Sequence, residues 1–167
     1  MGMTDTVTRW LSNIYPERTR AYLTGVLKPL ADRYSSQSLI TAGLAIKAGG
    51  GVLVKIGSAD YYAAASGVLV KIAASTDMPA LVGVITAASY NVFCFFVDSA
   101  AAVTVAMGTE ATTIGSVKFP PFPEGKALIG WILVTHSSTF TGNTTPLDTA
   151  TTVYFNGIGP FDPSMLI

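Results

Sequence analysis

The chain has 167 residues, enough for one domain with a sizeable core and a modest appendage, and too few for two independent cores of ordinary size. Its ten basic and ten acidic residues cancel, so no net charge draws the chain to a polyanion, and we expect no direct contact with nucleic acid. Half of the residues are hydrophobic and only 12% are charged, so we expect either a membrane or a partner subunit to cover part of the surface.

The first 36 residues hold eight of the twenty charged residues, which sets this segment apart from the rest of the chain. Trp10, Asn13 and Glu17 interrupt any long apolar run near the N-terminus, so we expect no secretory signal there. Residues 4–6 can cap a first short helix, whose apolar face is Val7, Trp10, Leu11 and Ile14.

Pro16 suits the first turn of a second helix, and Pro29 is expected to end or kink it. This second helix carries a largely apolar stripe made of Thr19, Tyr22, Leu23, Val26, Leu27 and Leu30. Helices this short are marginal in isolation, so the stripe must pack either on the chain's own β-domain or on a neighbouring subunit. The charged composition and the two amphipathic patterns thus predict a helical arm over residues 1–36.

From residue 35 onward the chain is rich in Ala, Gly, Thr, Val and Ile without a helical period, which predicts strands. The hexapeptide Gly-Val-Leu-Val-Lys-Ile occurs at 51–56 and again at 67–72, a single local duplication too short to indicate a repeat architecture. Strands are expected at 39–40, 44–47, 52–56, 61–64, 81–86, 90–97, 102–107, 112–119, 127–135 and 152–156, and in the second hexapeptide.

Residues 78–97 form a stretch of 20 residues without charge, which is long enough to span a membrane. Pro79 and Gly83 interrupt this stretch, and acids instead of Lys or Arg flank it. We therefore expect two strands joined by a turn, and no membrane contact. Further on, the proline-rich link 119–125 cannot lie in a central strand, and residues 137–152 are expected to form a long exposed loop.

The residues that could carry chemistry are few. His136 is the single histidine and is expected in a surface loop, so a zinc site or a histidine-based triad lacks further members. Cys94 lies in an apolar run and is expected to be a buried hydrophobe. Gly49-Gly50-Gly51 is not followed by the Lys of a phosphate-binding loop. We expect no enzyme activity, no metal and no cofactor; a virion-associated hydrolase using scattered carboxylates is a disfavoured alternative.

Three segments, 43–50, 81–93 and 123–134, give residues 40–160 a likeness to known proteins. This part of the chain resembles a group of small virion proteins of tailed bacteriophages. The resemblance implies a capsid decoration (cement) protein on the capsid surface of the virion, made in the cytoplasm of the host bacterium. It also implies self-association, often as a homotrimer. A head-fibre, tail-fibre or receptor-binding component of the virion is the alternative, with residues 137–145 contacting a host glycan.

The expected fold is therefore an all-β protein, a sandwich or jelly-roll-like antiparallel β-domain at 37–167, with a short helical N-terminal arm at 1–36. The expected function is to bind and stabilise the major capsid shell through protein-protein contacts. The arm would lie across the seam between major capsid subunits, with apolar and aromatic anchors and with arginines facing acidic capsid groups. The expected partner-binding residues are Trp10, Ile14, Tyr15, Arg18, Arg20, Tyr22 and Leu23.

Overall fold

The computed structural model describes residues 16–47 and 51–160. The chain divides into two compact units, 1–32 and 33–167. The second unit is called the β-domain below. In the part of the chain that the structure describes, no helix is long and apolar enough to cross a membrane.

Helix α2 (Pro16–Ser35) begins at the expected proline but does not end at Pro29. Of the two outcomes expected at Pro29, an end or a kink, the end is wrong, although a proline removes one backbone hydrogen bond and crowds the carbonyl four residues earlier. The β-domain holds the last turn in place. The Arg33 guanidinium lies 4.8 Å from the centre of the Phe122 ring, and the carbonyl of Ser35 accepts a hydrogen bond from the Gly67 amide at 2.8 Å. These contacts offset the cost of the proline.

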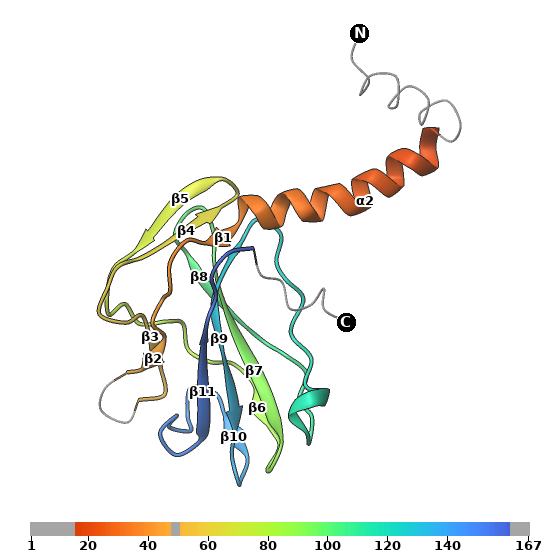
Figure 1. Ribbon diagram of the computed structural model, residues 1–167. Helices are drawn as coiled ribbons and strands as arrows, with labels where there is room; N and C mark the ends of the chain where they lie inside the picture. Colours follow the sequence, from red (N-terminus) through yellow and green to blue (C-terminus); the bar gives the residue numbers. More distant parts are fainter. Residues whose placement is uncertain (1–15, 48–50, 161–167) are drawn as a thin grey trace. The chain divides into compact units, whose positions relative to one another are not determined.

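The largest sheet of the β-domain has four antiparallel strands in the order β11-β9-β7-β8 (Figure 1). Its strands are β7 (Tyr90–Val97), β8 (Val103–Met107), β9 (Ala127–Thr135) and β11 (Thr151–Asn156). Of the two central strands, β7 is almost entirely buried, whereas β9 is buried over its first four residues and partly exposed at Trp131, Leu133 and Thr135. Their bounds agree with those expected from the sequence.

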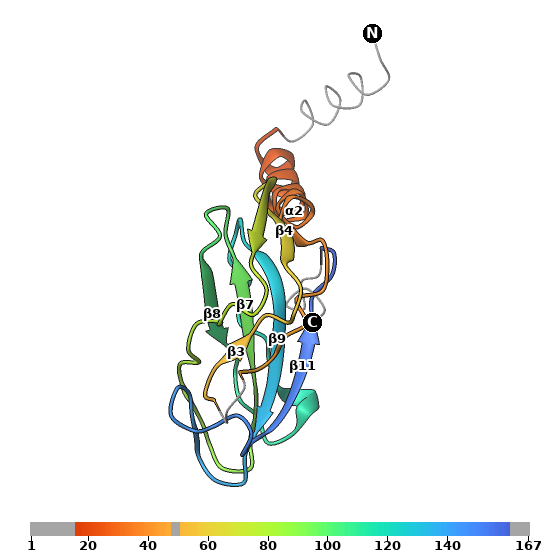
Figure 2. The same ribbon diagram turned by 90° about the vertical axis from the view of Figure 1, so that its left-hand side faces the viewer.

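Seven shorter strands form three further antiparallel sheets, and together with the large sheet they make an all-β, sandwich-like domain (Figures 1 and 2). One sheet has the order β1-β4-β5, and the others pair β2 with β3 and β10 with β6. Their bounds are Gln37–Ser38 (β1), Ala45–Ile46 (β2), Val54–Lys55 (β3), Tyr61–Ala65 (β4), Val68–Ile72 (β5), Val84–Ile85 (β6) and Phe140–Thr141 (β10). The main core lies between the sheets and includes Tyr61, Phe93, Phe95, Ile132, Phe140 and Leu147.

A buried hydrogen-bonded chain joins β1 and β4 to a bulge in β9. Phe95 faces Gly130 and Phe96 faces Leu128, so β9 carries one extra residue at this point. The Ser38 hydroxyl donates to the carbonyl of Leu128, and the Tyr61 hydroxyl lies 2.5 Å from the Ser38 oxygen. Burial raises the pKa of Tyr61 to about 12. Ser38 thus satisfies a carbonyl that the irregular ladder exposes, and Tyr61 completes the chain.

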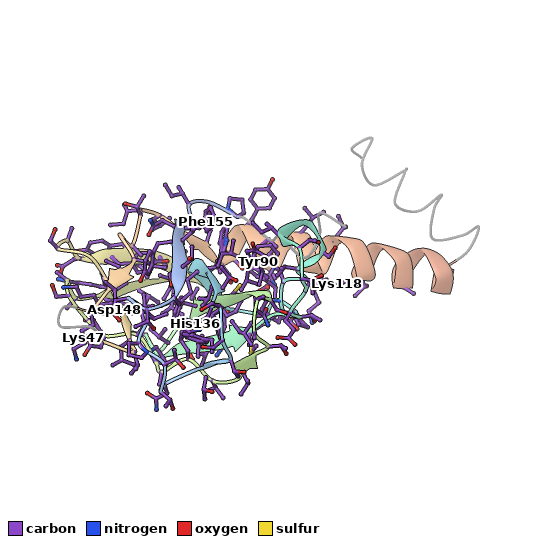
Figure 3. All side chains as sticks on the ribbon, turned by 90° about the horizontal axis from the view of Figure 1, so that it is seen from below. Lys47, Tyr90, Lys118, His136, Asp148 and Phe155 are labelled. Atoms are coloured by element: carbon purple, nitrogen blue, oxygen red, sulfur yellow. The ribbon has the colours of Figure 1, made fainter. Side chains whose placement is uncertain are left out.

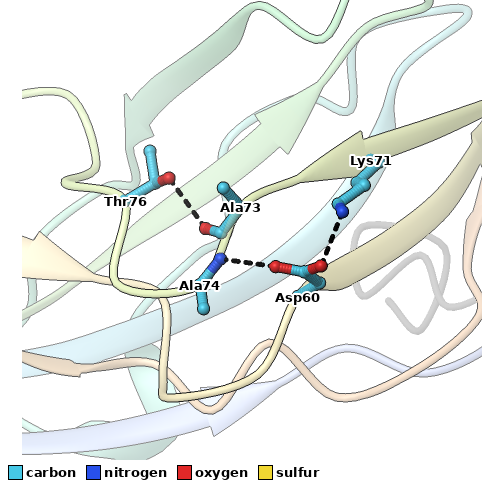
Figure 4. A network of polar contacts seen from close by, with 5 residues as sticks. All are labelled: Asp60, Lys71, Ala73, Ala74 and Thr76. Carbon is cyan, nitrogen blue, oxygen red and sulfur yellow. Dashed lines mark hydrogen bonds and ion pairs between the residues drawn. The ribbon is translucent and has the colours of Figure 1, made fainter.

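The two copies of the repeated hexapeptide place their last residues alike. Val54 and Ile56 are buried in the main core, as are their counterparts in β5, Val70 and Ile72. The earlier residues differ, since Leu69 is 68% exposed whereas its counterpart Leu53 is partly buried. Lys71 of β5 pairs with Asp60 at 2.6 Å (Figure 4). This ammonium group, together with the Ala74 amide, lowers the pKa of the Asp60 carboxyl.

The structure corrects three expected elements. Residues 112–119 form no strand: they contain a 3-10 helix at Ile114–Ser116, and Ile114 is 58% exposed, because the stretch pairs only through one isolated bridge, between Lys118 and Thr109. The expected strand at 39–40 is absent, and its place is taken by β1 at 37–38. The expected exposed loop 137–152 contains β10, whose Phe140 fills the core.

Two other expectations are confirmed. Residues 78–97 hold two strands, β6 and β7, with a turn between them that includes Ala88 at a φ of +58°. The proline-rich link 119–125 contains no strand.

Candidate interaction surface

The side chains that could carry chemistry, Cys94 and His136, each have a structural role in their surroundings. Cys94 is fully buried, and burial raises the pKa of its thiol to about 12, so it is a packed hydrophobe as expected. His136 is partly buried directly after β9, where its Nδ1 accepts a hydrogen bond from the Ser138 amide at 3.0 Å. Among the described residues, no three His, Cys, Asp or Glu side chains are grouped so that they could hold a metal ion.

The proline-rich link crosses the outer face of the large sheet, the face turned away from the main core. Phe122 packs edge-on against Phe96 with ring centres 4.9 Å apart, and Phe119 packs edge-on against Trp131 at 5.6 Å. These aromatic residues close a second, smaller core around Cys94 and Leu128. The link therefore covers the outer face over β7 and part of β9.

Toward β11 the outer face is open, and we name this area the β11 surface: Trp131 and Leu133 of β9 with Val153 and Phe155 of β11. In the ladder Phe155 lies opposite Trp131, and Val153 lies opposite Leu133, so the four side chains share one face. The rings of Phe155 and Trp131 stack at 5.2 Å with an angle of 14°. Figure 3 labels Phe155 on β11. Val153 is 44% exposed and Phe155 is 39% exposed, so the surface is apolar and accessible.

The backbone edge of β11 is also open. Among the described strands, β11 pairs with β9 alone and lies at the end of its sheet (Figure 2). Three other edge strands differ: Gly159 bridges β1, β5 carries Lys71, and the Lys126 ammonium donates to Thr104 of β8 at 3.1 Å. Charges and covering segments are the usual protection of edge strands against pairing with another chain. The six residues of β11 are uncharged, and none of the described strands pairs with its outer edge.

The structure describes only some of the partner-binding residues expected from the sequence. Trp10, Ile14 and Tyr15 lie outside the described residues. The other four, Arg18, Arg20, Tyr22 and Leu23, lie in α2, where the backbone alone is described. Their role stays a prediction.

Sequence reasoning missed the β11 surface. The strand-type composition predicted a strand at 152–156, and the alternation of Thr152, Val153, Tyr154 and Phe155 could have indicated two unlike faces. It could not indicate that the strand lies at an edge.

No protein-family model matches the chain, and neither a curated protein nor a solved structure shows significant similarity to it.

Proposed function

We propose that the chain is a structural protein of a tailed-bacteriophage particle that binds the major capsid shell and stabilises it, a capsid decoration or cement protein. The β11 surface is the observation that carries the proposal. An accessible stack of Phe155 on Trp131 beside an unprotected strand edge suits a protein that covers its apolar surface with other subunits. The sequence resemblance supplies the identity of those subunits.

In this proposal the two units have different tasks. The arm contacts the major capsid protein through Trp10, Ile14, Tyr15, Tyr22 and Leu23, while Arg18 and Arg20 face acidic capsid groups. The β-domain supplies self-association. The net charge of zero supports protein partners over nucleic acid.

The direct test mixes the purified protein with undecorated capsids of the parent phage and, separately, with host cells. Regular added density on the capsid in electron micrographs supports the proposal. Attachment to host cells without capsid density would instead support a fibre or receptor-binding component, and binding to neither would refute both.

A deletion variant tests the task of the arm. The deletion should remove residues 1–32 and not 1–36, because Arg33 and Ser35 belong to the β-domain and contact its Phe122 and Gly67, and the Ser36 hydroxyl accepts a hydrogen bond from the Ser66 amide. We expect the shortened protein to keep its cooperative unfolding and to lose capsid binding. Capsid binding at full strength by the shortened protein would refute the assigned role of the arm.

Charge reversal in the arm gives a finer test with a matched control. The variant Arg18→Glu/Arg20→Glu changes the charge by the same amount as Lys55→Glu/Lys118→Glu in the β-domain. If arginines of the arm face acidic capsid groups, only the first variant weakens capsid binding. Equal weakening by both would show a non-specific effect of net charge.

A further inference from the structure

The open edge of β11 is suited to another strand. A sheet edge presents unpaired backbone amides and carbonyls, which an added strand satisfies by continuing the ladder. The six residues of β11 are the longest edge that the described sheets offer, and β11 pairs with β9 along its full length. A strand added there would extend a regular part of the sheet.

The charges around the edge indicate which strand fits. No residue from 149 to 160 is charged, and none is charged in β9 at 127–135. A partner strand carrying charges would lose water there without gaining an opposite charge, so the matching partner is neutral. β11 of a second copy is such a strand, and it has the same length and the same apolar face.

The two faces of the strand restrict the register of such a pair. Val153 and Phe155 point to the outer face, while Tyr154 packs against the main core on the inner face. Residues directly opposite each other in an antiparallel pair point to the same face. If Tyr154 of one copy lies opposite Tyr154 of the other, then Val153 of each copy lies opposite Phe155 of the other. A β-branched residue opposite an aromatic one is a favourable cross-strand pair.

From these observations we infer that two copies of the chain pair through β11, antiparallel and about a two-fold axis at Tyr154. The pair joins two four-stranded sheets into one of eight strands. The two β11 surfaces become one apolar row across the seam. Each copy uses its β11 edge once, so the assembly closes at two copies, whereas the resemblance implies three.

The first experiment measures mass on the protein alone, so its outcome is independent of capsid binding. Sedimentation equilibrium of the full chain over a range of concentrations should show a reversible dimer. Val153→Lys should raise the dissociation constant by about tenfold or more, because it places an unpaired charge in the seam. The control Leu69→Lys, at an exposed residue of another edge strand, should leave the dissociation constant unchanged. A monomer at all concentrations, a trimer, or equal effects of the two variants would overturn the inference.

The second experiment tests the register by disulfide cross-linking, with folding of each variant checked by circular dichroism. Val153→Cys and Phe155→Cys are prepared separately, and Cys94 stays silent because it is buried. Opposite residues of a ladder lie within disulfide reach. A mixture of the two variants should form a cross-linked dimer on mild oxidation, and each variant alone should not. Cross-linking of Val153→Cys with itself, or no cross-linking in the mixture, would overturn the inferred pairing.

Discussion

The buried chain from Tyr61 through Ser38 to Leu128 gives the sharpest test of what holds the sheets together. Ser38→Ala removes the hydroxyl between the other two groups, so the Tyr61 hydroxyl loses its hydrogen-bond partner and the Leu128 carbonyl loses its side-chain donor in a dry interior. An unsatisfied buried group costs about 1–3 kcal/mol, so the expected loss in the free energy of unfolding is about 2–4 kcal/mol. Tyr61→Phe should cost only about 1 kcal/mol, because Ser38 still donates to the Leu128 carbonyl.

Chemical denaturation of both single variants and of the double variant measures these losses at one protein concentration. The double variant should lose less stability than the two single losses added together, because removing the Tyr61 hydroxyl also removes one of the groups that Ser38→Ala leaves unsatisfied. Ser58→Ala, at an exposed serine, is the control and should change stability by less than about 0.5 kcal/mol. Additive losses, or a loss for Ser38→Ala no larger than the control, would refute the reasoning.

Three further predictions concern pH, backbone strain and close packing. The thiol of Cys94, with a pKa raised to about 12 in the folded protein, ionises more readily when unfolded, so stability should fall as pH rises above about 9, by about 1.4 kcal/mol per pH unit. In denaturation series at several pH values, Cys94→Ala should delay the loss of stability until about pH 10, where ionisation of Tyr61 begins to lower stability as well. If the loss began at the same pH in this variant, Cys94 would not be its cause. Ala101→Gly should raise stability by about 0.5–1 kcal/mol, since Ala101 has a φ of +63°, whereas Ala100→Gly should lower it; a lower melting temperature for Ala101→Gly would contradict the strain. Gly130→Ala should cost about 2–3 kcal/mol and speed amide exchange in β11, because the added carbon would lie 2.3 Å from the Phe155 carbonyl oxygen; unchanged exchange would show that the strand adapts.

The parts of the fold that could be predicted are those whose local pattern is strong. β7 and β9 are long apolar runs bounded by turn residues, and their observed bounds are the expected ones. The strands of two residues are different, because contacts between distant segments determine them. β10 forms because Phe140 fills the core opposite Ile85, a pairing across 55 residues that no local pattern contains. Residues 112–119 show the converse: they have strand-like composition but gain no partner strand.

The contrast between local pattern and long-range contacts also explains why the sequence did not reveal the β11 surface. The alternation of Val153 and Phe155 with Thr152, Tyr154 and Asn156 is visible in the sequence, and the composition predicts a strand there. Whether such a strand lies at the centre or the edge of a sheet depends on the order of four strands drawn from residues 90–156. The aromatic cover over Phe96 likewise depends on where the proline-rich link crosses. Edge position and cover are properties of topology, so the structure was needed to locate the surface.

The stack of Trp131 on Phe155 also provides the protein with an optical reporter. The chain has two tryptophans, so Trp10→Phe leaves Trp131 as the sole indole emitter. Because Trp131 is half-buried beside an accessible ring, any molecule that settles on Phe155 changes the polarity around the indole. The wavelength of its emission therefore follows occupancy in dilute solution, without a dye or a label.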